Sequence, residues 1–256
     1  LALITSPEPL HIHLPCPTLL ACALLARIWS RDRHLTVHWH SFLKPRTFMP
    51  GVLWFAYEAF AIFCLRYFDK VVTTSPILQG LLQAKSSMPL SILVLPCNLP
   101  SPIEIAAIQT ASSKLCSLDQ HSDAEPCLPE AAPGLRVIVI GRLDSYKRID
   151  ALMESLALAC KHLDGGAPGL RLDIVGDGPN RLALERLSDS LLPGRVTFHG
   201  RLSEQMKLDL LAQSDVLVLP SFDCNEAFGI VQLEAMACAI PSLAFLNAKS
   251  GAYWVS

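Results

Sequence analysis

The amino-acid sequence predicts an α/β protein built from parallel β-sheets that are covered by helices. Three observations favour this fold class. Short apolar runs alternate with longer segments of helical periodicity, turns containing Pro or Gly separate them, and the alternation stops once and then restarts. Runs that are apolar along their whole length are typical of parallel strands buried on both faces. With 256 residues, the chain is long enough for two such units.

In the first hundred residues we expect four strands and three helices. Pro15 breaks the chain after the first strand, Pro76 precedes the third helix, and Pro96 stops the last strand. The predicted strands cover residues 10–14, 35–38, 70–74 and 92–95. The predicted helices cover residues 18–29, 51–68 and 77–84.

We divide the chain into a first domain of residues 1–100, a linker or surface insertion of residues 101–133, and a second domain of residues 134–256. The middle segment mixes Ser, Pro, Gln, His, Asp and Glu with little periodicity. After it we expect five strands, at residues 136–140, 170–175, 195–199, 216–219 and 242–245. The helices between them cover residues 149–162, 181–191, 203–213 and 228–238, with Ser203 as an N-cap. This order indicates a doubly wound, Rossmann-like sheet.

Composition excludes several classes of protein. Apolar residues make up 51% of the chain, charged residues 17%, and the net charge is −2. These values argue against a disordered chain and against a general nucleic-acid binder, which would carry an excess of basic residues. The nine cysteines form no C-x-x-C pair, and no His/Cys cluster has zinc spacing. We therefore expect reduced thiols in a cytoplasmic protein rather than a disulfide framework.

One apolar segment could be mistaken for a membrane span. Residues 51–68 are long enough to suggest one, but they include Glu58 and Arg66. A span needs about 20 nearly uncharged residues, so we interpret the segment as a buried or interfacial helix. Peripheral association with the inner face of a membrane stays open. Residues 1–3 lack the basic start of a signal peptide.

Two cations follow the first strand of the second domain. Ligands of doubly wound sheets bind at the carboxyl ends of the strands. Gly141 allows a tight exit from the strand, and Arg142 and Lys147 could hold an anion there. The alternative is a solvated basic loop. The turn Gly176-Asp177-Gly178-Pro179 follows the next strand, and we interpret it mainly as a sharp turn.

The richest segment joins Glu226 to Glu234. Eight helical residues span about 12 Å, so the two carboxylates cannot share one proton but could hold two hydroxyl-bearing parts of an elongated ligand. Between them, the amides of Phe228, Gly229, Ile230 and Val231 would form an anion site at a helix start. The alternative is an acidic cap followed by an ordinary surface glutamate.

Histidines lie at the ends of two strands in the first half. His11 and His13 flank one strand, and His38 and His40 end the next. A histidine in such a place is more often structural than functional. His40 is the best functional candidate because it follows its strand.

These segments together resemble a known family. The stretch E-A-F-G-I-V-Q-L-E from Glu226 to Glu234 resembles the E-x7-E motif of family 4 retaining glycosyltransferases of the GT-B fold. Upstream, G-R-L-D-S-Y-K, I-V-G-D-G-P, V-T-F-H-G-R-L and S-D-V-L-V-L-P-S are similar to other landmarks of the family, in the same order. The C-terminal S-G-A-Y-W-V-S resembles a variant in bacterial polysaccharide glycosyltransferases. The resemblance implies two Rossmann-like domains facing a cleft, with the acceptor side in residues 1–100 and the nucleotide donor in residues 134–256.

The resemblance also implies roles for the candidate residues. Arg142 and Lys147 would bind the diphosphate of a UDP-sugar or GDP-sugar, and Glu234 would hold the ribose hydroxyls. Glu226 would contact the donor sugar, and the amides of residues 228–231 would cradle sugar and phosphate. His40 would lie near the transferred sugar. No cofactor and no catalytic metal are expected, in keeping with the lack of a D-x-D motif.

Several departures from the family pattern qualify this function. The expected first strand with its glycine-rich loop is not found before His11, and the family's last elements are not found after Ser256. The usual P-x-G-I-D is replaced by P-C-N-L-P, and Ala239 stands where the family has Gly. We therefore expect both domains to be incomplete. The alternative to a transferase acting on a glycan or lipid-linked acceptor is a truncated, non-catalytic nucleotide-sugar-binding or scaffold module. A GT-B epimerase or phosphorylase is less favoured, because neither the acid/base residues nor the cofactor lysine is found.

Overall fold

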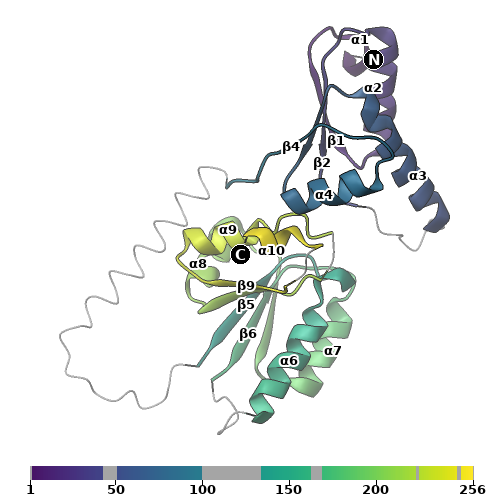
Figure 1. Cartoon of the computed structure of the whole chain (residues 1–256). Coiled ribbons are helices and arrows are strands. Elements are labelled where there is room, and N and C mark those ends of the chain that lie inside the picture. Colours follow the sequence, from purple (N-terminus) through teal and green to yellow (C-terminus); the bar gives the residue numbers. More distant parts are fainter. Residues whose placement is uncertain are drawn as a thin grey trace. The chain divides into compact units, whose positions relative to one another are not determined.

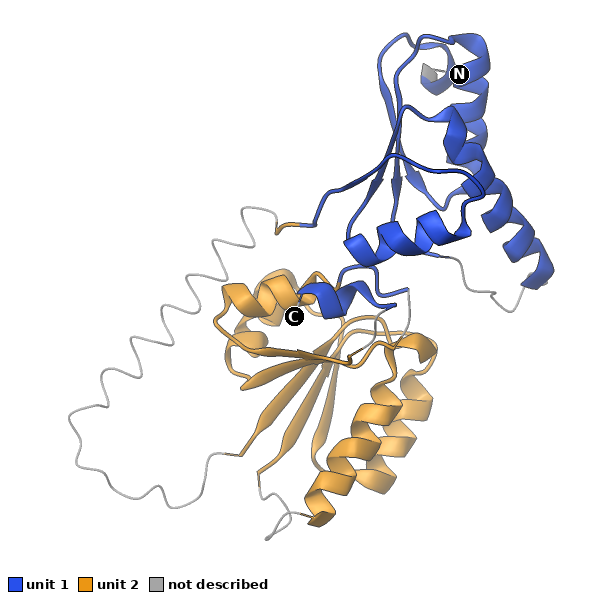
Figure 2. Ribbon diagram, viewed as in Figure 1, with its two compact units in different colours: residues 1–97, 223–228, 247–255 blue, residues 98–222, 229–246, 256 orange. Residues whose placement is uncertain are grey.

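The computed structural model describes residues 2–42, 51–99, 134–162, 169–222, 225–246 and 249–255. The chain divides into two compact units, shown in Figure 2. The first comprises residues 1–97, 223–228 and 247–255, and the second comprises residues 98–222, 229–246 and 256. The predicted linker at residues 101–133 lies outside the described residues.

The first unit contains a parallel sheet (Figure 1). Its strands are β1 (Leu10–Leu14), β2 (Leu35–Trp39), β3 (Lys70–Thr73) and β4 (Ile92–Val94), and they pair in the order β1-β2-β3-β4. Each strand lies within one residue of its predicted bounds at either end. Along β1, Leu10, Ile12 and Leu14 enter the hydrophobic core, while His11 and His13 point to the opposite face. The first sheet is therefore apolar on one face at this edge, whereas we predicted parallel strands that are buried on both faces.

The helices of the first unit depart from the prediction in three places. They are α1 (Ala2–Thr5), α2 (Pro17–Trp29), α3 (Gly51–Cys64), α4 (Pro76–Lys85) and α10 (Gly251–Val255), with a 3₁₀ turn η1 (Leu65–Tyr67). The sequence did not predict α1 or α10. The helix predicted to run to residue 68 ends at Cys64, because Leu65 and Phe68 both enter the core before β3 and the chain tightens there into a 3₁₀ turn.

Helix α3 leaves much of its apolar surface uncovered. Val52 is 77% exposed and Phe55 is 63% exposed, while Glu58 on the inner side is buried and bonded to Lys85. The helix is thus not a buried one. Among the residues that the structure describes, no helix is both long and apolar enough to cross a membrane.

The second unit has the predicted doubly wound sheet. Its strands are β5 (Arg136–Ile140), β6 (Arg171–Val175), β7 (Val196–Gly200), β8 (Val216–Leu219) and β9 (Ser242–Ala244), all parallel in the order β7-β6-β5-β8-β9. The chain winds outward from β5 in one direction and from β8 in the other. The boundary between β5 and β8 is therefore the topological switch point, where ligands of such sheets bind.

Helices cover both faces of the second sheet (Figure 1). They are α6 (Ile149–His162), α7 (Arg181–Leu191), α8 (Glu204–Ala212) and α9 (Val231–Ala237). One core gathers Val137, Val139 and the α6–α7 side, and the other gathers Ile138, Ile140 and the α8–α9 side. Ser203 caps α8 as predicted, since its Oγ accepts a hydrogen bond from the amide of Met206 at 3.3 Å.

Candidate functional site

Backbone hydrogen bonds join the loops after β5 and β6 at the carboxyl edge of the second sheet. The amide of Gly141 donates to Val175 O at 2.9 Å, and the amide of Leu143 donates to Asp177 O at 3.1 Å. A Cβ on Gly176 would lie 1.9 Å from Gly141 O, so only glycine allows this approach. The glycines of this turn thus serve the contact between the two loops, in keeping with the sharp turn expected there.

Lys147 is held directly above the end of β5. It closes the 3₁₀ turn η2 (Ser145–Lys147), whose cap is the Asp144 carboxylate accepting from the amide of Ser145 at 2.8 Å. The residue is only 8% exposed, and its Nζ lies 3.4 Å from the position that a Cβ on Gly141 would take. The Nζ also lies 5.3 Å from the centre of the Tyr146 ring. This lysine is therefore not a solvated surface group.

Arg142 occupies a different environment at the same edge. Its side chain is 54% exposed, and its Nε lies 3.5 Å from a carboxylate oxygen of Asp144. The surface ion pair is a weak restraint, so the guanidinium is free to turn toward an anion. The structure therefore gives one fixed and one adaptable cation at the strand end.

Glu234 is a buried carboxylate, and not the surface residue of the alternative interpretation. It lies on α9 and is 5% exposed. Lys207 on α8 donates from its Nζ to Glu234 Oε1 at 3.0 Å and to Glu204 Oε2 at 2.6 Å. The other oxygen, Glu234 Oε2, is buried and has no hydrogen-bond partner among the described residues. A buried acceptor without a donor is costly, so this oxygen marks a place where a ligand hydroxyl would be stabilising.

Both members of the Lys207–Glu234 pair have a pKa above its ordinary value, for different reasons. Burial raises the pKa of Glu234, and the hydrogen bond and charge of Lys207 offset this only in part. Burial alone would lower the pKa of Lys207, but hydrogen bonds and charges of Glu204 and Glu234 raise it above its ordinary value. Sequence reasoning missed Lys207, because its spacing from Glu204 resembles an ordinary surface pair on a helix.

Helix α9 is shorter than predicted at both ends, and this corrects the proposed anion site. It begins at Val231, not at residue 228. Gly229 has φ of 79°, a left-handed conformation that cannot belong to a helix, and Ile230 is the N-cap. The amides of Gly229 and Ile230 therefore precede the helix. Within the described part of the second unit, the amides of Gly229, Ile230 and Val231 donate to no acceptor.

Glu226 and Phe228 belong to the first unit, whereas Glu234 belongs to the second (Figure 2). Ala227 O accepts hydrogen bonds from Ser75 Oγ at 3.1 Å and from Thr74 Oγ1 at 3.3 Å. The amide of Gly251 donates to Glu226 O at 2.8 Å. The segment is thus anchored by its backbone, and Glu226 as a residue is 9% exposed.

Gly251 and Phe228 complete this anchor. A Cβ on Gly251 would lie 1.8 Å from Ala227 O, so only glycine fits at the start of α10. Phe228 is buried, and its ring lies 6.0 Å from that of Trp254 on α10. The two glutamates of the E-x7-E motif are therefore held by different compact units.

His40 extends β2 and pairs with a histidine on β1. Its amide donates to Leu14 O at 2.9 Å, and its Nε2 lies 2.5 Å from His13 Nδ1. Burial, followed by the charges of His13 and His11, lowers the pKa of His40. Burial and the three neighbouring histidines lower the pKa of His38 to about 4. The lowered pKa favours the neutral form of His40, which could accept or relay a proton.

The second half of the chain matches a known family. Residues 129–250 match the family described as glycosyl transferases group 1. The GDP-mannose-dependent alpha-(1-6)-phosphatidylinositol dimannoside mannosyltransferase of Mycobacterium tuberculosis is 36% identical over 104 residues, 40% of this chain and 25% of that protein. The N-acetyl-alpha-D-glucosaminyl L-malate synthase of Bacillus anthracis is 33% identical over 108 residues, 42% of this chain and 26% of that protein. The chain thus spans about a quarter of the length of these curated relatives.

Solved structures share the fold over most of the chain. HepE of Anabaena, solved in complex with UDP, matches with a TM-score of 0.67 at 21% identity, over 98% of this chain and 63% of that one. WaaG, a glycosyltransferase involved in lipopolysaccharide biosynthesis, matches with a TM-score of 0.61 at 15% identity, over 94% and 69%. The predicted fold class, α/β with two Rossmann-like parallel sheets as in GT-B glycosyltransferases, is confirmed.

Proposed function

Because residues 129–250 match the family of group 1 glycosyl transferases, we propose that the chain transfers a sugar from a nucleoside-diphosphate sugar to a glycan or lipid-linked acceptor. The donor would be a UDP-sugar or a GDP-sugar, and the transfer would retain the anomeric configuration, as in family 4. Its place would be in the synthesis of a polysaccharide or glycoconjugate. Relatives that use GDP-mannose support this donor class.

The observation that carries the proposal is the half-satisfied carboxylate of Glu234. One oxygen is fixed by Lys207, while the other is buried without a donor in the described structure. A ribose offers neighbouring hydroxyls that would supply the missing donor. Lys207 thus becomes a positioning residue, which sets the orientation of the carboxylate before the ligand arrives.

The two cations at the end of β5 would stabilise the leaving group. When the bond to the donor sugar breaks, negative charge grows on the nucleoside diphosphate. The buried Lys147 at the end of β5 and the more exposed Arg142 would bind that charge. The amides of Phe228, Gly229, Ile230 and Val231 would contact sugar and phosphate from the approach to α9. We expect no metal and no other cofactor in this step.

Glu226 and His40 would act on the sugar side. The donor C1 becomes oxocarbenium-like as the bond to the diphosphate breaks. The acceptor hydroxyl would then attack C1 from the face that the diphosphate vacates, and its proton would pass to the departing phosphate oxygen. Glu226 would orient the sugar hydroxyls, and neutral His40 would lie near the transferred sugar. The anchoring of residues 226–228 through Ala227 O supports a fixed role for this segment.

We place the activity in the cytoplasm, at the inner face of a membrane. The exposed apolar side chains of α2 and α3, among them Ile28, Trp29 and Phe55, support peripheral contact with lipid. Binding of the chain to vesicles with and without anionic lipid, followed by sedimentation, tests this placement.

The test of the proposed function measures nucleotide-sugar turnover and nucleotide binding separately. Wild type is compared with Lys147→Ala, Glu226→Ala and Glu234→Gln. The controls are Lys161→Ala and Glu154→Gln, two exposed positions of α6. Removing one pre-organised hydrogen-bond donor that faces the developing negative charge typically lowers the rate about 10²–10³-fold, so we expect Lys147→Ala to lose turnover on that scale. Glu234→Gln should weaken UDP or GDP binding, because the amide cannot reproduce the carboxylate acceptor. The control variants should match wild type.

Two outcomes would contradict parts of this proposal. Unchanged turnover in Lys147→Ala and Glu226→Ala would remove the site assignment. Nucleotide binding that depends on Glu234, with no transfer to any acceptor, would favour the alternative of a non-catalytic nucleotide-sugar-binding module. A panel of UDP-sugars and GDP-sugars identifies the base and the sugar.

A further inference from the structure

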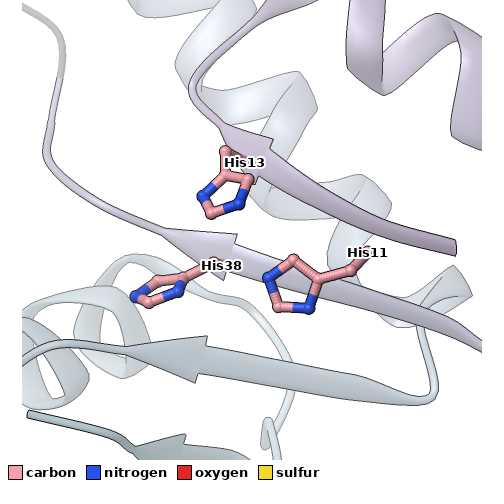
Figure 3. A group of neighbouring side chains, drawn as sticks. All are labelled: His11, His13 and His38. Atoms are coloured by element: carbon pink, nitrogen blue, oxygen red, sulfur yellow. The ribbon is translucent and has the colours of Figure 1, made fainter.

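Three histidines, His11, His13 and His38, gather on one face of the first sheet. His11 and His13 lie two residues apart on β1, so their side chains leave the strand on the same side. His38 lies on β2, where the parallel register places it beside His13. Figure 3 shows the three imidazoles clustered over these two strands. The opposite face of β1 carries Leu10, Ile12 and Leu14, so the polar face is a distinct surface.

The three rings are close enough to share one small ligand. One ring nitrogen from each of His11, His13 and His38 lies within 4.8 Å of the other two. Ring centroids are 5.0 Å apart for His11 and His13, and 5.6 Å apart for His13 and His38. Nitrogen ligands on a tetrahedral zinc ion are roughly 3.3 Å apart, given metal–nitrogen distances of about 2.0–2.1 Å. Rotation of exposed side chains closes that difference, because His11 and His13 are both exposed.

We propose that His11, His13 and His38 form a binding site for a divalent transition-metal ion, with zinc as the ion that fits the donor set. Neutral imidazole nitrogens suit zinc, copper and nickel, whereas magnesium and calcium prefer oxygen ligands. Three histidines leave a fourth tetrahedral position for water, as in open zinc sites. Two ligands come from one strand and the third from its hydrogen-bonded neighbour, so the backbone already holds the site in place.

His40 contacts two of the three proposed metal ligands, His13 and His38. Its Nε2 contacts His13 Nδ1 at 2.5 Å, and its ring stacks on that of His38 with centroids 4.2 Å apart. A histidine that binds metal through one nitrogen commonly uses its other nitrogen in a hydrogen bond, which fixes the ring. His13 would therefore bind the metal through Nε2. Sequence reasoning missed the site because its ligands come from two strands and show no zinc spacing in the linear sequence.

Metal titration of the full chain tests the inference. After treatment with a chelator, the chain is titrated with zinc by calorimetry and with cobalt by absorption spectroscopy. We compare wild type with His11→Gln and His38→Gln, and use His162→Gln, an exposed histidine at the end of α6, as the matched control. We expect one zinc per chain in wild type and in His162→Gln, visible bands of tetrahedral cobalt, and a loss of affinity of at least about 10-fold in each of the other two variants.

Three results would overturn the inference. The first is the absence of saturable zinc binding at micromolar concentration in wild type. The second is unchanged affinity in His11→Gln and His38→Gln, with circular dichroism confirming that both are folded. The third is a near-ultraviolet charge-transfer band of cobalt bound to thiolate, which would assign the metal to cysteines. Zinc should also raise the thermal stability of wild type, as a ligand that binds only the folded state does.

Discussion

The two sheets of this chain are both parallel, but they bury their surfaces differently. In the second sheet, alternate residues of β5 enter two separate cores, one on each face. In the first sheet, β1 sends Ile12 and its apolar neighbours to one face and His11 and His13 to the other. A parallel sheet thus need not be apolar on both faces, and a polar face on such a sheet is a candidate for function.

The largest effects should come from substitutions that test this contrast directly. Ile138 and Ile174 are fully buried on opposite faces of the second sheet, so replacing either by alanine should cost about 2–5 kcal/mol in the free energy of unfolding. Ile12→Ala on the core face of β1 should cost a similar amount. By contrast, His11→Ala on the other face should stay within about 0.5 kcal/mol, as surface substitutions do.

Hydrogen–deuterium exchange measured strand by strand separates the two units in this experiment. Each core substitution should speed exchange in its own sheet, and His11→Ala should leave exchange in β1 unchanged. If His11→Ala lowered the free energy of unfolding as much as Ile12→Ala does, both faces of β1 would contribute equally to stability. The contrast between the two sheets would then be wrong.

The same contrast explains which features could be predicted from the sequence. The bounds of β5, α6, α7 and β8 matched because continuous apolar runs and clear helical periods leave little choice. The start of α9 was wrong because Gly229 adopts a left-handed backbone that periodicity does not encode. In β1 the pattern L-H-I-H-L alternates with period two, which itself indicates a strand with one polar face.

The candidate site was predictable only in part. Lys147 and Glu234 follow from position, because strand ends and helix starts locate the carboxyl edge of a doubly wound sheet. The contact of Lys207 with Glu234 joins two helices that are distant in sequence, so it needs tertiary structure. The anchoring of Ala227 O by Ser75, 152 residues away, is equally invisible in the linear pattern.

The buried ion pair of the second unit should give the next largest effect. Lys207→Met would leave Glu234 buried without its cation, and we expect a loss on the order of 3 kcal/mol at neutral pH. Burial raises the pKa of Glu234, so the folded state holds the proton more tightly and stability falls as pH rises through that pKa. The loss in Lys207→Met should therefore shrink on acidification. Urea unfolding at several pH values measures it.

The double variant Lys207→Met/Glu234→Gln is the control for this pair. It removes both charges, so it should recover most of the stability lost in Lys207→Met. A pH-independent loss of stability in the single variant would mean that packing of the lysine side chain, and not the unpaired charge of the buried Glu234, sets the effect.

The smallest effect should come from the ion pair of the first unit, which is more exposed. Asp69 Oδ2 accepts from Arg27 Nη2 at 2.7 Å and from the amide of Leu35 at 2.7 Å, and its side chain is 40% exposed. Burial alone would raise the pKa of Asp69, but these two hydrogen bonds and the charge of Arg27 hold it below its ordinary value. A lowered carboxyl pKa contributes stability above the unfolded value of 3.8, and that stability is lost as pH falls through the folded pKa.

Asp69→Asn should therefore melt at a slightly lower temperature than wild type at pH 7, and this gap in melting temperature should narrow below pH 3.8. Added salt should narrow it as well, because the pair faces solvent. The exposed Asp32→Asn variant serves as control, and a gap that persists unchanged at low pH would show that Asp69 acts through packing alone.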